Sequence, residues 1–152
     1  MGYLIIKRRF ILSNWNNRFI DMARLVATWS KDPSSKVGAV IVDDKKRIVS
    51  VGFNGYPKGI PDEYNGDRED KLRKSIHAEE NAILFAKCDL SDLIIYVTHP
   101  PCSKCGTIII QSGIKKVICL KPSDDFLERW KVDIDTSKEM FNHAGVELIY
   151  ID

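Results

Sequence analysis

The chain has 152 residues, of which 44% are hydrophobic and 29% are charged, and its formal net charge at pH 7 is +2. This composition is typical of a globular domain and excludes an intrinsically disordered chain. The small net charge argues against a dedicated nucleic-acid-binding protein, which usually carries a concentrated basic face. One Lys or Arg is nevertheless enough for a small anionic ligand. We predict a single domain over residues 1–152.

The cysteines and the N-terminal residues indicate a cellular compartment. Lys7-Arg8-Arg9 follows the first apolar run instead of preceding it, which is not the order found in a secretory signal peptide. No apolar run approaches the length needed to span a bilayer. The sequence therefore favours the reducing cytoplasm, where cysteines bind metals or remain thiols rather than form disulfides. The four cysteines are Cys88, Cys102, Cys105 and Cys119.

The N-terminal part predicts an arm, a helix and a hairpin. Residues 1–12 are interpreted as an arm that docks on the body of the protein or on a partner. Asn14 can cap a helix whose apolar residues recur at steps of three and four, and Asp32-Pro33 ends it. The apolar runs 37–42 and 47–53 flank a polar turn, which predicts an antiparallel hairpin. The helix face comprises Trp15, Phe19, Met22, Ala23 and Val26.

The rest of the chain predicts a long loop and then alternating helices and strands. Residues 54–75 are rich in Gly, Pro and charged residues, which predicts an irregular loop with one short helix. Loops of this length are commonly functional. The whole order predicts an α/β fold of three α/β/α layers around a mixed five-stranded sheet. The remaining predicted elements are a helix at about 77–87, a strand at 93–97, a helix at 103–112 stopped by Gly113, a strand at 116–120, a helical region from Ser123 or Asp124 through Asn142 with a break near 132–135, and a strand at 146–151 that follows Gly145.

Three metal-binding residue types stand at the starts of two predicted helices. Cys102 and Cys105 have Cys-x-x-Cys spacing, and exposed amides at a helix start favour the thiolate that binds metal. His77 begins the other helix. If the two helices lie side by side, three ligands converge. Three protein ligands leave the fourth tetrahedral position of zinc open for water, which is typical of a catalytic site rather than a structural one.

Glu79 lies two residues after His77, close enough to reach a metal-bound water without having to bind the metal itself. Zinc lowers the pKa of water towards about 7, and a nearby carboxylate can then carry protons to the substrate. Pro101 fixes the approach to Cys102 and can direct the carbonyl group of Pro100 inward.

Each of these features has another interpretation when taken alone. A Cys-x-x-Cys pair is also typical of a redox centre or half of a structural zinc site. A histidine or glutamate at a helix start is often a cap or a response to the helix dipole. Asn54 before Gly55 is a turn signal, and Lys36 can simply be solvated. Cys88 and Cys119 are interpreted as packed thiols.

The combination is narrower, because His-x-Glu followed by Pro-Cys-x-x-Cys is the signature of zinc-dependent nucleobase deaminases. The chain resembles the cytidine deaminase superfamily, and within it the deoxycytidylate (dCMP) deaminases, from about Phe19 to the C-terminus. Phe53 departs from the family pattern, where tyrosine is usual. His99 departs as well, since it occupies a usually apolar slot before Pro100. The matching segments are 32–39, 52–59, 77–83, 96–98, 101–105 and 111–117.

This resemblance implies a cytidine deaminase-like fold and hydrolysis of dCMP to dUMP and ammonia, which supplies thymidylate synthesis. It implies zinc held by His77, Cys102 and Cys105, with Glu79 as the catalytic proton shuttle. It also implies a homo-oligomer, often a hexamer, activated by dCTP and inhibited by dTTP. The implied substrate contacts are Asn54 to deoxyribose, the Ala78 amide to the pyrimidine, Lys36 to the phosphate, and Pro100. The implied effector region comprises Gly55, Tyr56, Lys58 and Gly59.

Two other classes of function stay open. The same catalytic core supports deamination of a base in tRNA or single-stranded DNA. That alternative requires a basic surface and stacking aromatics, and the acidic residues between Asp62 and Asp70 argue against it. A non-catalytic zinc-stabilised binding module would require a fourth protein ligand and no role for Glu79. The pattern supplies neither of these.

Overall fold

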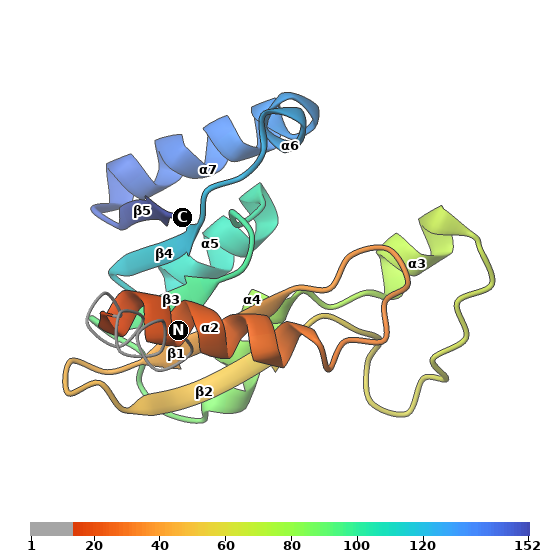
Figure 1. The fold of residues 1–152 in the computed structure, drawn as a ribbon, viewed down its shortest axis with the longest axis horizontal. Helices are drawn as coiled ribbons and strands as arrows, with labels where there is room; N and C mark the ends of the chain where they lie inside the picture. Colours follow the sequence, from red (N-terminus) through yellow and green to blue (C-terminus); the bar gives the residue numbers. More distant parts are fainter. Residues whose placement is uncertain (1–13) are drawn as a thin grey trace, which may run out of the picture.

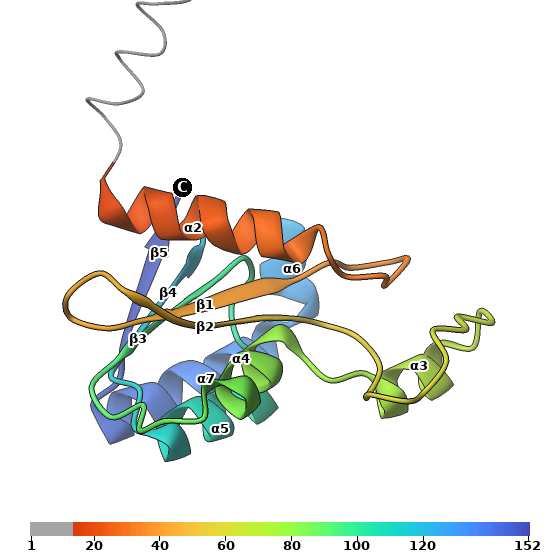
Figure 2. The ribbon, with the colours of Figure 1, turned by 90° about the horizontal axis from the view of Figure 1, so that it is seen from below.

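The computed structural model describes residues 14–152, and the predicted arm at residues 1–12 lies outside the described residues. Figures 1 and 2 show the arrangement of helices around one sheet. The elements are α2 (Trp15–Ala27), β1 (Gly38–Val42), β2 (Ile48–Phe53), α3 (Arg68–Lys74), α4 (Ala78–Ala86), β3 (Ile94–Val97), α5 (Ser103–Ser112), β4 (Lys116–Leu120), α6 (Asp124–Arg129), α7 (Lys131–Ala144) and β5 (Glu147–Ile151).

The five strands form one mixed sheet in the order β2-β1-β3-β4-β5. β1 is antiparallel to both β2 and β3, whereas β3, β4 and β5 are parallel to one another. Figure 2 shows α2 on one face of the sheet and α4, α5 and α7 on the other. The predicted hairpin, mixed sheet and three-layer architecture are therefore confirmed.

The apolar run that forms β1 is explained by burial on both faces. All five of its residues are buried, so the strand shows no alternation of polar and apolar side chains. Val40 and Val42 pack with the apolar face of α2, whereas Ala39 and Ile41 pack with Ala78 and its neighbours on α4. These two cores fix the helices that flank the sheet.

Asn14, Gly113 and Gly145 mark helix ends as predicted, whereas α2 ends at Ala27, before the predicted stop at Asp32-Pro33. The Asn14 Oδ1 atom accepts a hydrogen bond from the Asn17 amide at 2.9 Å. Gly113 and Gly145 end α5 and α7 in the left-handed conformation, with φ of 89° and 74°. The predicted position of the break in the last helical region is wrong, because the structure places it at Trp130.

Trp130 leaves the helical conformation, with φ of −109° and ψ of 18°, and α7 begins at the next residue. The Asp133 carboxylate accepts hydrogen bonds from the Ser103 amide at 2.8 Å and the Ser103 hydroxyl at 2.6 Å. Asp133 therefore belongs to α7 and fastens that helix to the start of α5. Within residues 14–152, no helix has the length and hydrophobicity to span a membrane.

Residues 54–76 form the predicted loop with one short helix, α3, and they project from one end of the sheet (Figure 1). Gly55 and Ile76 close the base of this excursion with two backbone hydrogen bonds of 3.1 and 2.8 Å. The Lys71 ammonium group on α3 reaches the mostly buried Asp32 carboxylate at 3.1 Å. The excursion is thereby attached to the segment that precedes β1.

Candidate metal centre

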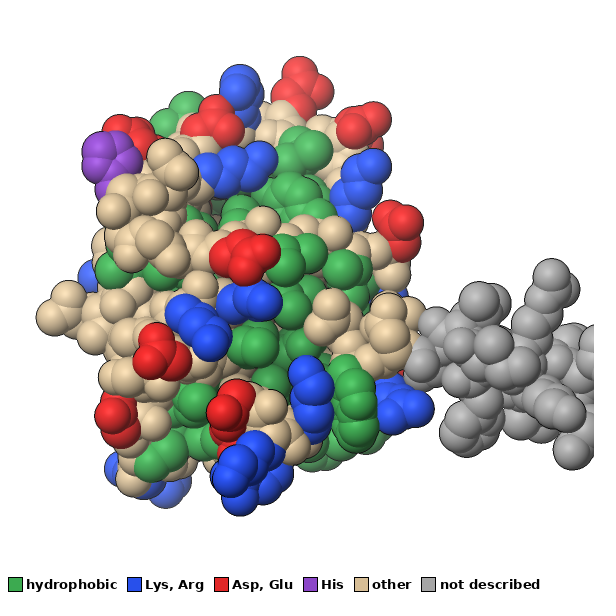
Figure 3. Space-filling view, turned by 90° about the vertical axis from the view of Figure 1, so that its left-hand side faces the viewer, with side chains coloured by type: hydrophobic (Ala, Val, Ile, Leu, Met, Phe, Trp, Pro, Cys, Tyr) green, Lys and Arg blue, Asp and Glu red, His purple; other side chains and the backbone are tan. Residues whose placement is uncertain are grey.

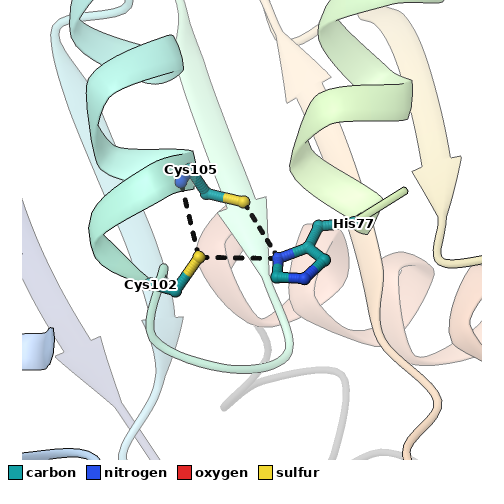
Figure 4. Close-up of side chains that lie close together, drawn as sticks. All are labelled: His77, Cys102 and Cys105. Atoms are coloured by element: carbon teal, nitrogen blue, oxygen red, sulfur yellow. Dashed lines mark hydrogen bonds between the residues drawn. The ribbon is translucent and has the colours of Figure 1, made fainter. Parts of the chain in front are cut away.

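His77, Cys102 and Cys105 converge where α4 and α5 begin (Figure 4). His77 is the N-cap residue of α4, and Cys102 is the N-cap residue of α5. Cys105 lies in the first turn of α5 and is buried. The two helices lie side by side under the same face of the sheet (Figure 2), so their starts meet, as the sequence predicts.

The spacing of the three donor atoms fits a tetrahedral zinc ion. The His77 Nδ1 atom lies 3.5 Å from the Cys102 Sγ atom and 3.3 Å from the Cys105 Sγ atom. The three donor atoms all lie within 4.8 Å of one another. Nitrogen and sulfur ligands on one tetrahedral zinc are separated by about 3.6 Å, given bond lengths of about 2.1 and 2.3 Å. One imidazole and two thiols are also donors that zinc prefers.

The three side chains share protons when no metal is bound. The hydrogen bond from Cys105 and that from His77 lower the pKa of the Cys102 thiol to about 4, against the effect of burial. The hydrogen bond to Cys102 raises the pKa of His77 to about 9. The hydrogen bond to Cys102, together with burial, raises the pKa of Cys105. Because metal ligands are deprotonated, zinc binding displaces the protons on His77 and Cys105.

Glu79 lies in the first turn of α4, two residues from His77, and only 4% of its surface is exposed. Burial raises the pKa of its carboxyl group to about 7. A carboxyl group with a pKa near neutrality both accepts and donates protons readily, which general acid–base catalysis requires. The site therefore places a carboxyl group that can carry protons beside three side chains that can hold a metal ion.

Asn54 is buried and makes local contacts. Its Oδ1 atom accepts a hydrogen bond from the Val37 amide at 2.9 Å, and its Nδ2 group donates to the Ser35 carbonyl oxygen at 2.8 Å. These bonds hold the segment on either side of Lys36. Ala78 is fully buried at the start of α4. The predicted ligand contacts of both residues stay predictions.

Lys36 and Pro100 line a cavity of about 370 Å³. The cavity lies between α2, the segment that leads to Cys102, and the connection from β4 to α6. Its wall also includes Arg24, His99, Lys121 and Phe126. Sequence reasoning did not connect Arg24, Lys121 and Phe126 with the site, because no spacing pattern joins three segments so far apart in the chain.

The predicted effector region lies at the base of the 54–76 excursion. The Tyr56 ring packs on Tyr64, with 4.7 Å between ring centroids, and the Lys74 ammonium group lies 6.0 Å from the Tyr56 ring. Gly59 has a φ of 85°, which favours glycine. Effector binding by Gly55, Tyr56, Lys58 and Gly59 stays a prediction.

The two cysteines outside the metal centre differ from each other. Cys119 is fully buried in β4, as the packed-thiol interpretation predicts. The same interpretation is wrong for Cys88, which is exposed. Cys88 follows the left-handed residue Lys87 that ends α4, where the chain turns towards solvent.

Comparison with known proteins places this fold and site in one family. Residues 13–121 match the family described as the cytidine and deoxycytidylate deaminase zinc-binding region. This match covers more than half of the chain, which therefore belongs to the cytidine and deoxycytidylate deaminase family. The predictions of a deaminase and of zinc as its cofactor are confirmed.

Individual relatives agree with this placement. A protein of Aliivibrio fischeri described as an uncharacterized deaminase is 55% identical over 142 residues, which are 93% of this chain and 96% of that protein. Human deoxycytidylate deaminase is 36% identical over 154 residues, covering 96% and 84% of the two chains. The solved structure of dCMP deaminase from cyanophage S-TIM5, in complex with dCMP and dUMP, is 27% identical with a TM-score of 0.70 and covers 88% of this chain and 94% of that chain.

Proposed function

We propose that this chain hydrolyses dCMP to dUMP and ammonia. The observation that carries the proposal is the convergence of His77, Cys102 and Cys105 beside the buried Glu79. The similarity to human deoxycytidylate deaminase and to the cyanophage enzyme solved with dCMP and dUMP supports the choice of substrate. We assign the zinc ligands to these three residues and the proton transfers to Glu79.

Zinc held by these ligands supplies an activated water, whose pKa it lowers towards about 7. The chain's own residues orient the substrate and move the protons. Glu79 takes a proton from the attacking water and gives it to N3 of the cytosine ring while the water oxygen forms a bond to C4. It then takes the remaining hydroxyl proton and passes it to the leaving amine, so that the C4–N bond breaks, ammonia departs and C4 keeps a carbonyl oxygen. Ala78 contributes its backbone amide to the pyrimidine, and Asn54 contacts the deoxyribose.

The finer predictions belong to the same proposal. We propose a single deaminase domain whose dUMP supplies dTTP synthesis, with activation by dCTP and inhibition by dTTP through Gly55–Gly59. We also propose a homohexamer, supported by Leu84 and Phe85 on α4, which are 59% and 58% exposed in the single chain. Four free cysteines support a reducing, cytoplasmic location.

A nucleic-acid substrate is the second candidate from the sequence, and the surface gives it less support. Figure 3 shows one face on which basic and acidic side chains are interspersed. A concentrated basic face is what single-strand binding requires. A zinc-stabilised binding module has less support as well, because the metal-ligand cluster found within residues 14–152 contains three residues and not four.

The test is ammonia release by zinc-loaded protein with dCMP, CMP, deoxycytidine, dCTP, a tRNA and single-stranded DNA. We expect turnover of dCMP, and further stimulation by dCTP would support the regulatory proposal. Turnover of the nucleic acids alone would keep the zinc chemistry and overturn the substrate. No turnover of any of the six would favour the binding module.

Glu79→Gln separates proton transfer from metal binding. We expect this variant to keep one zinc per chain and to lose about 100-fold or more of kcat, since general acid–base catalysis contributes about 10²–10⁴-fold. Zinc content by atomic absorption and kcat for dCMP are the measurements. Glu80→Gln is the matched control, because Glu80 is the adjacent residue on α4 and is only partly buried. Wild-type turnover in Glu79→Gln would remove Glu79 from its proposed role.

A further inference from the structure

The start of α5 lacks the usual kind of helix cap. The N-cap residue of a helix is usually Ser, Thr, Asp or Asn, whose side-chain oxygen accepts a hydrogen bond from an amide of the first turn. In α5 this position is occupied by Cys102, whose Sγ atom accepts from the Cys105 amide at 3.4 Å. Sulfur is a weaker acceptor than oxygen. The first turn of α5 therefore has no oxygen acceptor at its own cap.

α7 supplies an oxygen acceptor instead. The Asp133 Oδ2 atom accepts a hydrogen bond from the Ser103 amide at 2.8 Å, and the Oδ1 atom accepts one from the Ser103 hydroxyl at 2.6 Å. Both carboxylate oxygens are thus bonded to the residue that directly follows Cys102. Hydrogen bonds to an ionised acceptor are about twice as strong as those between neutral groups. Asp133 therefore fixes the first residue of α5 by two strong bonds.

The position of α7 beside α5 is itself fixed (Figure 2). Ser137 lies one turn after Asp133, is 2% exposed, and donates a hydrogen bond from its hydroxyl to the Pro101 carbonyl oxygen at 3.2 Å. Phe141, one further turn along the helix, is buried in the core between the helices and the sheet. α7 thus binds both the residue before Cys102 and the residue after it.

Hydrogen bonds from α4 do not hold the start of α5 in the same way. His77 comes from the start of α4, and its Nδ1 atom approaches both thiols (Figure 4). Apart from these contacts, no hydrogen bond joins α4 to α5 within residues 14–152. The distance between His77 and Cys102 before metal binding therefore depends on apolar packing and on the bonds between α5 and α7.

We propose that Asp133 is a positioning residue of the metal centre, which holds the zinc ligand Cys102 in place through its hydrogen bonds to Ser103. The proposal rests on the proposed function in one respect, because it takes Cys102 as a zinc ligand. It adds α7 to the metal centre, although residues 131–144 lie beyond the segment 13–121 that matches the zinc-binding family.

The test is the zinc affinity of Asp133→Ala, measured by competition with a chromogenic chelator. A partner that orients a metal ligand typically contributes about 10–100-fold to metal affinity, so we expect binding about tenfold weaker or more. Asp135→Ala is the matched control, because Asp135 lies on the same helix and pairs with Lys131 at 2.8 Å rather than with α5. Circular dichroism verifies that each zinc-free protein is folded, and a loss of global stability alone then leaves zinc affinity unchanged.

Variants of Ser103 test whether the effect passes through the proposed bond. Ser103→Ala removes the hydroxyl donor and should weaken zinc binding about two- to tenfold. In the Asp133→Ala background the same substitution should have no further effect, because its partner is already absent. Ser103→Thr keeps the hydroxyl and should bind zinc like the wild type. Wild-type zinc affinity in Asp133→Ala would overturn the positioning role, as would an equal loss from Ser103→Ala in both backgrounds. Ser103→Ala also decides the question if Asp133→Ala does not fold.

Cys102→Ala separates the failure of this inference from that of the proposed function. Loss of zinc from Cys102→Ala, with wild-type affinity in Asp133→Ala, would keep the ligand assignment and overturn the positioning role alone. One zinc per chain in Cys102→Ala would show that the proposed ligand set is wrong, and the inference would fail with it. None of these measurements requires turnover of dCMP, so a different substrate would leave the inference intact.

Discussion

Replacing Gly52 by alanine is expected to displace the helix that begins at the metal centre. A Cβ atom at Gly52 would lie 2.3 Å from the Ala78 carbonyl oxygen and 2.4 Å from the Ala82 amide nitrogen. Both are backbone atoms of α4, so no side-chain rotation relieves the overlap. Ordinary contacts of a Cβ atom begin at 3.4 Å. The helix must therefore move by about 1 Å away from β2.

The size of the effect follows from what α4 carries. His77 and Glu79 move with the start of this helix, whereas Cys102 and Cys105 belong to α5. Overpacking costs typically about 1–3 kcal/mol of folding free energy. A displacement of about 1 Å at a catalytic site can lower turnover about 100-fold. We therefore expect Gly52→Ala to lose stability, zinc affinity and activity together.

The assay is guanidinium chloride unfolding of zinc-loaded protein, with zinc dissociation followed by a chromogenic chelator and kcat for dCMP. Gly106→Ala is the control, because a Cβ atom there meets the Ser137 Oγ atom at 3.3 Å and the Met140 Cε atom at 3.4 Å, and both side chains can move. Alanine also favours the helix by about 1 kcal/mol over glycine. If Gly52→Ala matched the wild type in all three measurements, the close approach of β2 and α4 would not position the metal centre.

Two further predictions concern acid stability and metal ligation. Burial acts to raise the pKa of Asp32, but hydrogen bonds from the Ser35 and Ser34 amides and from Lys71 outweigh it and hold this pKa below its ordinary 3.8. The Asp32 carboxylate therefore stabilises the folded protein fully above pH 3.8, and this stabilisation is lost as the pH falls through the lower pKa of the folded state. The free energy of unfolding of Asp32→Asn should therefore be about 2 kcal/mol lower than that of the wild type at pH 7. If the difference between the two proteins did not narrow below pH 3.8, this reasoning would be contradicted. Metal ligation is tested by alkylation with iodoacetamide, followed by mass spectrometry. We expect the exposed Cys88 to be modified in zinc-loaded protein. After chelation Cys102 should be modified as well, because its pKa is then about 4. Cys102 that stays unmodified after zinc removal would argue against that ligation.

Local signals explain how much of the fold was predictable. Asn14, Gly113 and Gly145 mark helix ends, because a cap or a left-handed residue acts within a few positions of the chain. The apolar runs predicted the strands, because burial on the sheet requires them. The break near 132–135 was misplaced because it depends on contacts between residues far apart in the chain. Asp133 lies in the first turn of α7, and its partner Ser103 is thirty residues earlier in the chain, so this contact could not be read from local sequence.

The cluster of candidate metal ligands was predictable because its chemistry depends on short spacings. Cys-x-x-Cys and His-x-Glu each lie within one helical turn, so residue types and intervals carry the information. Cys88 was wrongly interpreted, because exposure at a helix end depends on where the chain turns. The departure at His99 was visible in the sequence, whereas its place in the wall of the cavity was not.

By itself, the sequence determined the order of the elements, the three candidate metal ligands and the family. The tertiary structure decided which side chains line the cavity between α2, the segment that leads to Cys102 and the β4–α6 connection. Arg24, His99 and Lys121 come from a helix, the segment after β3 and the segment after β4, and only the packing of these elements on one sheet brings them together. The burial of Glu79 is also a tertiary property, because the pKa of a carboxyl group rises only when surrounding elements exclude water from it.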